Sequence, residues 1–140
     1  MAVDHVERTV VLDASPEDVW RAVSDEAELA EWFGADVALD PTPGGRGRFD
    51  EPGGATRHAV VEEVDEGRRL VWRWWGDDGA APSRVALTVE RVDGGTRLTV
   101  VEAPVVPRAA AGEGLRAARA AAWDRRLLAL ELRSLVPAGV

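Results

Sequence analysis

The sequence of 140 residues contains no cysteine, so it forms no disulfide, no thiol nucleophile and no cysteine-ligated zinc or iron–sulfur site. It also lacks lysine, isoleucine, asparagine, glutamine and tyrosine. The absence of asparagine excludes N-glycosylation sequons. We interpret the missing types as codon bias in a G+C-rich genome, and therefore infer no function from the use of arginine in place of lysine.

Long apolar runs are also missing, since none approaches the roughly 20 residues of a membrane span. The first residues are charged and lack the apolar core of a signal peptide, so a cytoplasmic protein is expected. Acidic side chains number 25 and basic ones 17, for a net charge of −8. This field opposes phosphate backbones and anionic lipids, and we expect neither nucleic acid nor membrane as a partner.

The composition that is present fits one globular domain over residues 1–140. Apolar residues make up 46 % and charged residues 30 % of the chain, which is a globular rather than a disordered balance. A chain of this length buries enough surface to be stable without a disulfide or a metal.

The first elements are a strand predicted over residues 6–12 and a helix with Ser15 as N-cap and Pro16 at its first position. A second short helix is predicted over residues 25–32. The pattern then changes to short strands in which polar and apolar side chains alternate. These strands are predicted at residues 37–39, 47–50, 56–64, 70–75, 84–92 and 96–102.

The longest helix is predicted over residues 113–136, and its apolar side chains form two stripes on nearly opposite sides. The first stripe consists of Ala120, Trp123, Leu127 and Leu130, and the second of Leu128, Leu132 and Leu135. We therefore expect this helix either to be buried on two sides or to carry a homodimer interface. Together the elements predict an α+β fold whose antiparallel sheet curls around the long helix and leaves a cavity beside it.

Residues with catalytic or metal-binding chemistry are sparse. His5 and His58 are the only histidines, and His5 with Glu7 offers two metal ligands without a third. The serines lack a G-x-S-x-G context, and the glycines at 44, 45 and 47 match no phosphate-binding pattern. We expect no catalytic residue, no metal and no cofactor, and these absences argue against an enzyme.

Glu102 is the polar residue in the most unusual position. By alternation it shares an inward face with Leu98 and Val100, where an unpaired carboxylate is costly and its pKa is perturbed. There it would act as a general acid or base, or hold a polar group of a ligand. The alternative interpretation is that Glu102 lies in solvent at the strand end or pairs with an arginine such as Arg126.

The aromatic side chains are the second candidate feature, because six of the 140 residues are tryptophan. Alternation and helical spacing direct Trp72, Trp74 and Trp123 into the space between sheet and helix, with Trp32 and Phe33 near its mouth. Such walls suit flat apolar ligands, while core filling is the alternative. The predicted ligand-binding set is Trp32, Phe33, Trp72, Trp74, Glu102, Trp123 and Leu127.

Four stretches, in their order and spacing, resemble the START-like superfamily, also called SRPBCC. They are VVLDASPEDVW at 10–20, EWFG at 31–34, VDEGRRLVWRW at 64–74 and GTRLTVVE at 95–102, and Trp123 and Leu127 complete the pattern. The sequence is most similar to the branch named for the activator of the heat-shock ATPase. This resemblance implies the helix-grip (Bet v-like) fold: a curved antiparallel sheet of about seven strands around a long C-terminal helix, with two short helices after the first strand.

Three hypotheses for function follow from the residues and the resemblance. The first is a non-enzymatic protein that takes an apolar or aromatic small molecule into the sheet–helix cavity, with Glu102 as polar anchor. The second is a polyketide cyclase or hydrolase that uses Glu102 as acid or base. The third is a protein-interaction module of the co-chaperone kind, which would bind a chaperone and needs no cavity.

Overall fold

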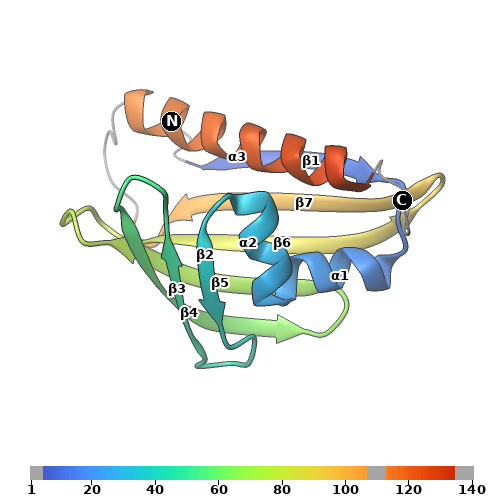
Figure 1. The fold of residues 1–140 in the computed structure, drawn as a ribbon, viewed down its shortest axis with the longest axis horizontal. Helices are drawn as coiled ribbons and strands as arrows, with labels where there is room; N and C mark the ends of the chain where they lie inside the picture. Colours follow the sequence, from blue (N-terminus) through green and yellow to red (C-terminus); the bar gives the residue numbers. More distant parts are fainter. Residues whose placement is uncertain (1–4, 107–112, 135–140) are drawn as a thin grey trace.

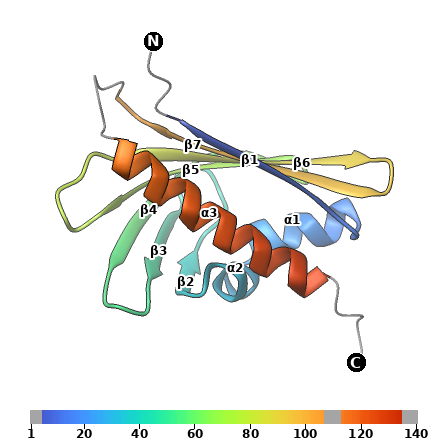
Figure 2. The ribbon, with the colours of Figure 1, turned by 90° about the horizontal axis from the view of Figure 1, so that it is seen from above.

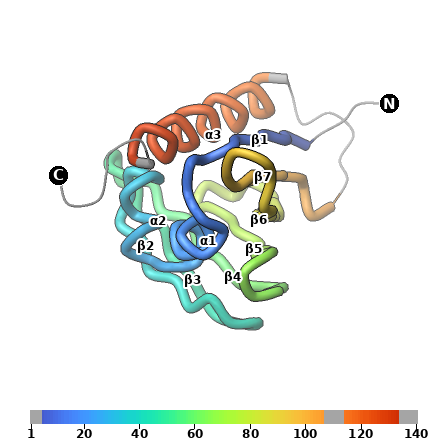
Figure 3. Tube along the Cα trace, turned by 90° about the vertical axis from the view of Figure 1, so that its right-hand side faces the viewer, coloured from blue at the N-terminus to red at the C-terminus, as the bar shows by residue number. Residues whose placement is uncertain are grey.

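The computed structural model describes residues 5–106 and 113–134, which form one seven-stranded antiparallel sheet and three helices. The order of strands across the sheet is β1-β7-β6-β5-β4-β3-β2. In chain order the elements are β1 (Val6–Leu12), α1 (Pro16–Ser24), α2 (Glu26–Phe33), β2 (Asp36–Leu39), β3 (Arg46–Asp50), β4 (Thr56–Asp65), β5 (Arg69–Gly76), β6 (Ser83–Val92), β7 (Gly95–Pro104) and α3 (Glu113–Ser134). The predicted helix-grip fold is confirmed, with the sheet curving around the helices (Figure 1, Figure 3).

The two short helices begin and end where capping chemistry requires. The Ser15 side chain accepts a hydrogen bond from the Asp18 amide at 3.2 Å, and Pro16 occupies the first helical position, as predicted. Asp25 follows α1 and caps α2, accepting from the Glu28 amide at 3.0 Å. Gly34 ends α2 with φ +65°, a left-handed conformation that glycine adopts without Cβ strain.

The register of the sheet selects which side chains face the helices. Trp72 lies opposite Val85 on β6, and Val85 in turn lies opposite Glu102 on β7. Trp74 lies opposite Ser83, the first residue of β6. Because side chains alternate along a strand, all five point to the concave face, and each is at most 3 % exposed.

Helix α3 crosses the open side of this concave face (Figure 2). Its C-terminal half packs on α2, and Arg133 there contacts Glu28 and forms an ion pair with Glu31 at 2.9 Å. The first predicted stripe is confirmed as the packed side, with Trp123 and Leu127 at most 4 % exposed.

The second predicted stripe lies on the opposite side of α3, and the structure contradicts one of its two interpretations, burial of the helix on two sides. Leu128 is 56 % exposed and Leu132 is 57 % exposed, so burial on two sides within the monomer is wrong for these residues. The physical reason is that α3 rests on the sheet and α2 with one face only. Leu135 lies outside the described residues. None of the three described helices is long and apolar enough to span a membrane.

Candidate functional site

A pocket of about 170 Å³ opens between the first half of α3 and the sheet, at the end where β7 approaches Pro104. Its lining combines small apolar side chains with one indole and several charged groups. The lining residues are Arg57, Trp74, Trp75, Gly76, Asp78, Ala80, Ala81, Ser83, Glu102, Leu115, Ala118, Arg119, Ala122 and Arg126. Two of the seven residues predicted from the sequence, Trp74 and Glu102, are among them.

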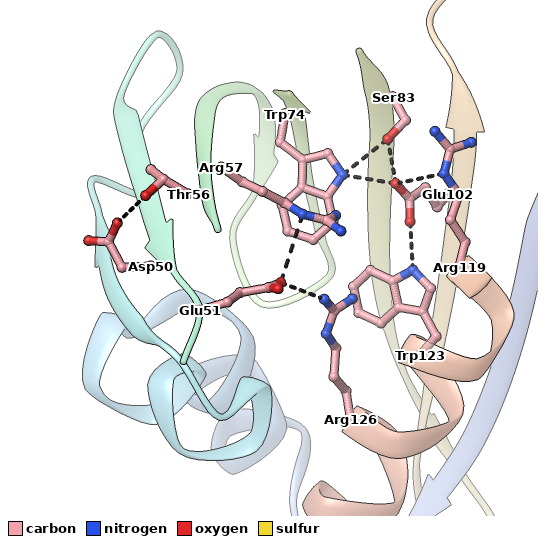
Figure 4. A network of polar contacts seen from close by, with 10 residues as sticks. All are labelled: Asp50, Glu51, Thr56, Arg57, Trp74, Ser83, Glu102, Arg119, Trp123 and Arg126. Atoms are coloured by element: carbon pink, nitrogen blue, oxygen red, sulfur yellow. Dashed lines mark hydrogen bonds and ion pairs between the residues drawn. The ribbon is translucent and has the colours of Figure 1, made fainter. Parts of the chain in front are cut away.

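Glu102 is a buried polar residue in the lining of this pocket and is only 2 % exposed. Its Oε2 accepts hydrogen bonds from the Trp74 indole Nε1–H at 2.9 Å and from the Ser83 hydroxyl. Its Oε1 accepts from the Trp123 indole Nε1–H at 2.9 Å. The Arg119 Nε lies 3.8 Å from Oε2, so a cation also faces the carboxylate (Figure 4).

These contacts decide the protonation state of Glu102. Burial by itself raises the pKa of this carboxyl, but the hydrogen bonds from Ser83, Trp74 and Trp123, with the charge of Arg119, outweigh burial. The pKa of Glu102 therefore lies below its ordinary value. At neutral pH the group is a carboxylate whose two oxygens are both occupied, so it accepts hydrogen bonds and has no proton to donate.

The predicted alternative for Glu102 is a position in solvent at the strand end or a pair with an arginine such as Arg126. The solvent position is wrong, and the pair with an arginine is found with Arg119 in place of Arg126. The strand continues to Pro104, so Glu102 is not at its end and lies under α3. Its cationic neighbour is Arg119 at 3.8 Å, and Arg126 instead approaches Glu51, with 3.5 Å between Nη2 and Oε1. The inward position expected from alternation along β7 is confirmed.

Arg126 is the second buried charge of the site, with 3 % of its surface exposed. Its guanidinium carbon lies 4.7 Å from the ring centroids of Phe33 and Trp123, and 5.5 Å from that of Trp74. Cation–π attraction of this kind partly replaces lost hydration. The Nε–H of Arg126 is buried without a hydrogen-bond partner among the described residues.

Burial lowers the pKa of Arg126 to about 10, and repulsion from Arg57 acts in the same direction. Glu102 and Glu51 oppose this effect. Arg126 is still protonated at neutral pH, so the pocket holds a desolvated positive charge. Such a charge is unfavourable unless several strong acceptors surround it.

Arg57 completes the cationic side of the pocket from β4. Its guanidinium carbon stacks 4.3 Å from the Trp74 ring centroid, and its Nε lies 3.8 Å from the same Glu51 oxygen that Arg126 approaches. One carboxylate oxygen is thus divided between two arginines, at distances longer than hydrogen bonds. Figure 4 shows both guanidinium groups converging on Glu51 beside the two indoles.

The family model described as Activator of Hsp90 ATPase homolog 1-like protein matches residues 13–132, which is most of the chain. The chain belongs to this family. The resemblance to the heat-shock ATPase activator branch is therefore confirmed. No curated protein matches the chain.

Several solved structures share the fold of this chain. DynU16, described as a protein of the dynemicin biosynthetic locus, is 25 % identical with a TM-score of 0.82 over 93 % of this chain, which spans only 46 % of DynU16. Protein MLL2253 from Mesorhizobium loti is 20 % identical with a TM-score of 0.82, covering 94 % of this chain and 96 % of its own. Aha1 from Colwellia psychrerythraea, described as a dimer, is 18 % identical with a TM-score of 0.78, covering 92 % and 94 %.

In this family member, the other five predicted site residues lie in the core behind the pocket. Trp32, Phe33, Trp72, Trp123 and Leu127 are each at most 8 % exposed. The rings of the four aromatic residues lie close together: the centroid of Phe33 is 5.6 Å from that of Trp123 and 6.3 Å from that of Trp72. Of these five, Trp123 is tied directly to the site through its hydrogen bond to Glu102.

Sequence reasoning did not select Arg57, Ser83 or Arg119. A signal for each was present. Arg57 lies two residues before the buried Ala59 on β4, and Ser83 two residues before the buried Val85 on β6, so each shares a face with a buried residue. Arg119 lies four residues before Trp123, one turn away on the same helix face. Arginine and serine side chains are mostly exposed in proteins, which is why hydrophobic patterns did not find these positions.

Two further features of the described residues were compared with this pocket. A broader, shallower hollow of about 520 Å³ beside α2 is lined mainly by acidic and small side chains, among them Glu31, Asp36 and Asp50. No cluster of three or more histidine, aspartate or glutamate side chains within residues 5–106 and 113–134 is arranged to hold a metal ion. Of these two hollows, the pocket at Glu102 combines apolar walls with buried polar groups, so we take it as the candidate site.

Proposed function

We propose that this protein binds a small aromatic molecule without catalysis, in the pocket between α3 and the end of β7. The observation that carries the proposal is the pocket itself, about 170 Å³, with the Trp74 indole on one wall and Leu115, Ala118 and Ala122 of α3 on another. Apolar walls with a few convergent polar groups are typical of small-molecule sites.

The volume limits the size of the ligand. An engineered cavity of roughly 150 Å³ accepts benzene, whereas pockets for drug-sized ligands measure roughly 300–1,000 Å³. A pocket of about 170 Å³ therefore suits one aromatic ring with a small substituent. It is too small for a folded polyketide chain of several rings, which weighs against the cyclase hypothesis.

The state of Glu102 also weighs against catalysis. A general acid needs a proton at the working pH, and a general base works best when its pKa lies near that pH. The pKa of Glu102 is lowered, and both of its oxygens accept hydrogen bonds from Trp74, Trp123 or Ser83. Its role in the proposal is to hold the two indoles that shape the pocket.

The first experiment is mass spectrometry of the purified protein under native and then denaturing conditions. A ligand carried through purification appears as an added mass that is lost on denaturation. The ligand-free protein is then titrated with single-ring aromatic probes, benzoate and benzamide, and binding is followed by tryptophan fluorescence.

A pocket-filling substitution assigns the binding to this site. Ala122 lines the pocket and is partly buried, so Ala122→Leu places a larger side chain inside it. We expect affinity for the bound probe to fall at least tenfold. Ala121→Leu is the matched control, because Ala121 is an exposed neighbour outside the lining. Absence of binding to both probes, or equal affinity in both variants, contradicts the proposal.

The family match supports a second candidate function, an interaction module that acts on Hsp90. It predicts that adding the protein to Hsp90 raises the rate of ATP hydrolysis. An unchanged rate at saturating protein, with no complex detected by sedimentation, excludes this function. The Ala122→Leu variant separates the two candidates, since filling the pocket does not alter an outer interaction surface.

The outer face of α3 supports a proposal of self-association. Leu128 and Leu132 lie one turn apart and are both more than half exposed, and the solved Aha1 from Colwellia psychrerythraea is described as a dimer. Sedimentation velocity of the wild type against a Leu128→Glu, Leu132→Glu variant tests it. A monomeric wild type contradicts a homodimer.

A further inference from the structure

Resting on the proposed small-molecule site, we propose that its ligand is an anion, a carboxylate attached to a single aromatic ring, and that the Arg126 guanidinium binds the carboxylate with help from Arg57 and Arg119. The chemical class follows from charge, burial and volume at one place. Each of these is a property of the described residues.

The charge of the pocket runs against the charge of the chain. The whole protein carries −8, yet the pocket is lined by three arginines and two carboxylates, those of Glu102 and Asp78. The Glu102 oxygens are occupied by two indoles and a hydroxyl. Asp78 is exposed and accepts from the Ala80 amide at 3.0 Å, so it lies at the solvent edge. At the buried end, the three guanidinium groups of Arg57, Arg119 and Arg126 face the two carboxylates of Glu102 and Glu51, which leaves one positive charge in excess.

Arg126 is the part of this charge whose hydrogen-bonding groups are least completely satisfied. The side chain is 97 % buried, its Nε–H has no hydrogen-bond partner among the described residues, and its Glu51 contact is 3.5 Å long. A guanidinium offers five donors in a planar fork that fits the two oxygens of a carboxylate. A bound carboxylate would supply the acceptors that Arg126 lacks, and its negative charge would offset the repulsion between Arg126 and Arg57.

The other walls explain why the anion should be aromatic. Leu115, Ala118 and Ala122 present apolar surface on the α3 side, and the pocket volume of about 170 Å³ exceeds what a carboxylate alone would fill. An inorganic anion would leave this apolar surface in contact with water. A ring attached to the carboxylate buries it, which is favourable in proportion to the area removed from water.

The test compares three probes by isothermal titration calorimetry on the full chain: benzoate, its neutral isostere benzamide, and inorganic phosphate. We expect benzoate to bind at least tenfold more tightly than either of the others. We expect Arg126→Met to remove that preference, lowering the benzoate affinity at least tenfold while the benzamide affinity changes less than twofold. Circular dichroism confirms that each variant is folded.

Two further variants serve as a control and as a second test of the arginine contacts. Arg125→Met is the matched control, because it removes one positive charge from an exposed neighbour on the same helix that does not line the pocket. It should leave all three affinities within twofold. Arg119→Met removes a second arginine of the pocket, whose side chain is 16 % exposed. We expect it to lower the benzoate affinity, and it replaces Arg126→Met as the test if that variant does not fold.

The outcomes separate this inference from the function on which it rests. Equal binding of benzoate and benzamide overturns the anion and leaves the aromatic ligand standing. Phosphate binding as tight as benzoate binding overturns the aromatic carboxylate in favour of a simple anion site. A benzoate preference that survives in both Arg126→Met and Arg119→Met overturns the assigned contacts. Binding of none of the probes overturns both the inference and the proposed function.

Discussion

The two ends of the protein interior are built on different principles, although the same sheet and helices enclose both. At the end near α1, the core is largely apolar, with Leu12, Val23 and Leu98 at most 2 % exposed. At the end that holds the pocket, two charged side chains, Glu102 and Arg126, are buried beside Trp74 and Trp123. Thr96 and Glu102 mark the two ends along β7, about 20 Å apart at the rise of a strand.

The apolar end contributes most of the folding stability, whereas the buried charge of Arg126 at the polar end reduces it. Each fully buried aliphatic side chain contributes roughly 1.5–3 kcal/mol at the apolar end. At the polar end, Glu102 is compensated by three hydrogen bonds, whereas Arg126 has only long ion-pair contacts and ring faces. Incomplete compensation of a buried charge is common where function, not stability, maintains it.

The largest expected effect comes from removing Glu102. Glu102→Leu leaves the Trp123 indole and the Ser83 hydroxyl without their acceptor and removes one of the two acceptors of the Trp74 indole. It also leaves Arg119 without its carboxylate. We expect the free energy of unfolding to fall by about 3–5 kcal/mol, measured by denaturant titration.

Glu90→Leu is the matched control for that substitution. Glu90 lies on β6, and its exposed side chain pairs with Arg97 at 2.8 Å. Removing such a surface pair costs about 0–1 kcal/mol. Similar losses in the two variants would mean that the polar end does not depend on Glu102.

The next largest effect is expected from replacing Arg126, which should raise the free energy of unfolding. Because burial lowers the pKa of Arg126 to about 10, the protonated side chain opposes folding at neutral pH by roughly 1–3 kcal/mol. Arg126→Met removes the charge and keeps an apolar side chain against the rings. We expect the ligand-free variant to be more stable than the wild type by this amount, while Arg125→Met changes stability by less than about 0.5 kcal/mol.

The dependence of stability on alkaline pH provides a second test of the buried charge of Arg126. The chain has no lysine, tyrosine or cysteine, the side chains that ordinarily titrate from about pH 8 to 11. The groups facing Arg126 are Arg57, Glu102, Glu51 and Arg125. Because the folded-state pKa of Arg126 is lowered, the wild type should gain stability as pH rises through about 10. The stability of Arg126→Met should stay level over that range, and a level wild-type profile contradicts the assignment.

Two tryptophans on β5 offer a smaller and closely matched comparison. The Trp74 Nε1–H donates to Glu102 and Ser83, whereas the buried Trp72 Nε1–H has no partner among the described residues. Replacing either with phenylalanine removes a similar volume. We expect Trp74→Phe to destabilise the protein more than Trp72→Phe by about 1–2 kcal/mol, because only the former removes hydrogen bonds to buried acceptors. Equal losses in thermal or chemical denaturation would show that the hydrogen bonds to Glu102 add nothing beyond packing.

The smallest effect is expected outside both regions, on the exposed face of α3. Leu128→Glu with Leu132→Glu should change the stability of the monomer by less than about 0.5 kcal/mol per site, since both side chains are more than half exposed. Denaturant titration at low protein concentration measures this. A loss of several kcal/mol would mean that these leucines are buried in solution, as at a dimer interface.

Local signals in the sequence determined the elements and the face that each presents. Ser15 and Pro16 specify the start of α1 through capping and a preset φ angle. Alternation along β5 and β7 placed Trp74 and Glu102 on the inner side, because successive side chains of a strand point to opposite faces. Helical spacing likewise placed Trp123 and Leu127 on the packed side of α3.

Tertiary structure alone decided which of these side chains meet. Glu102 and Arg126 both face inward, yet the crossing of α3 over the sheet brings Arg119 to Glu102 and leaves Arg126 beside Glu51. Ser83 reaches Glu102 because the register of β5, β6 and β7 aligns their ends. Periodicity along one chain segment determines a direction but not a partner, since the partner comes from another element. The burial of Arg126, on which the inferred ligand depends, is therefore a property of the assembled fold.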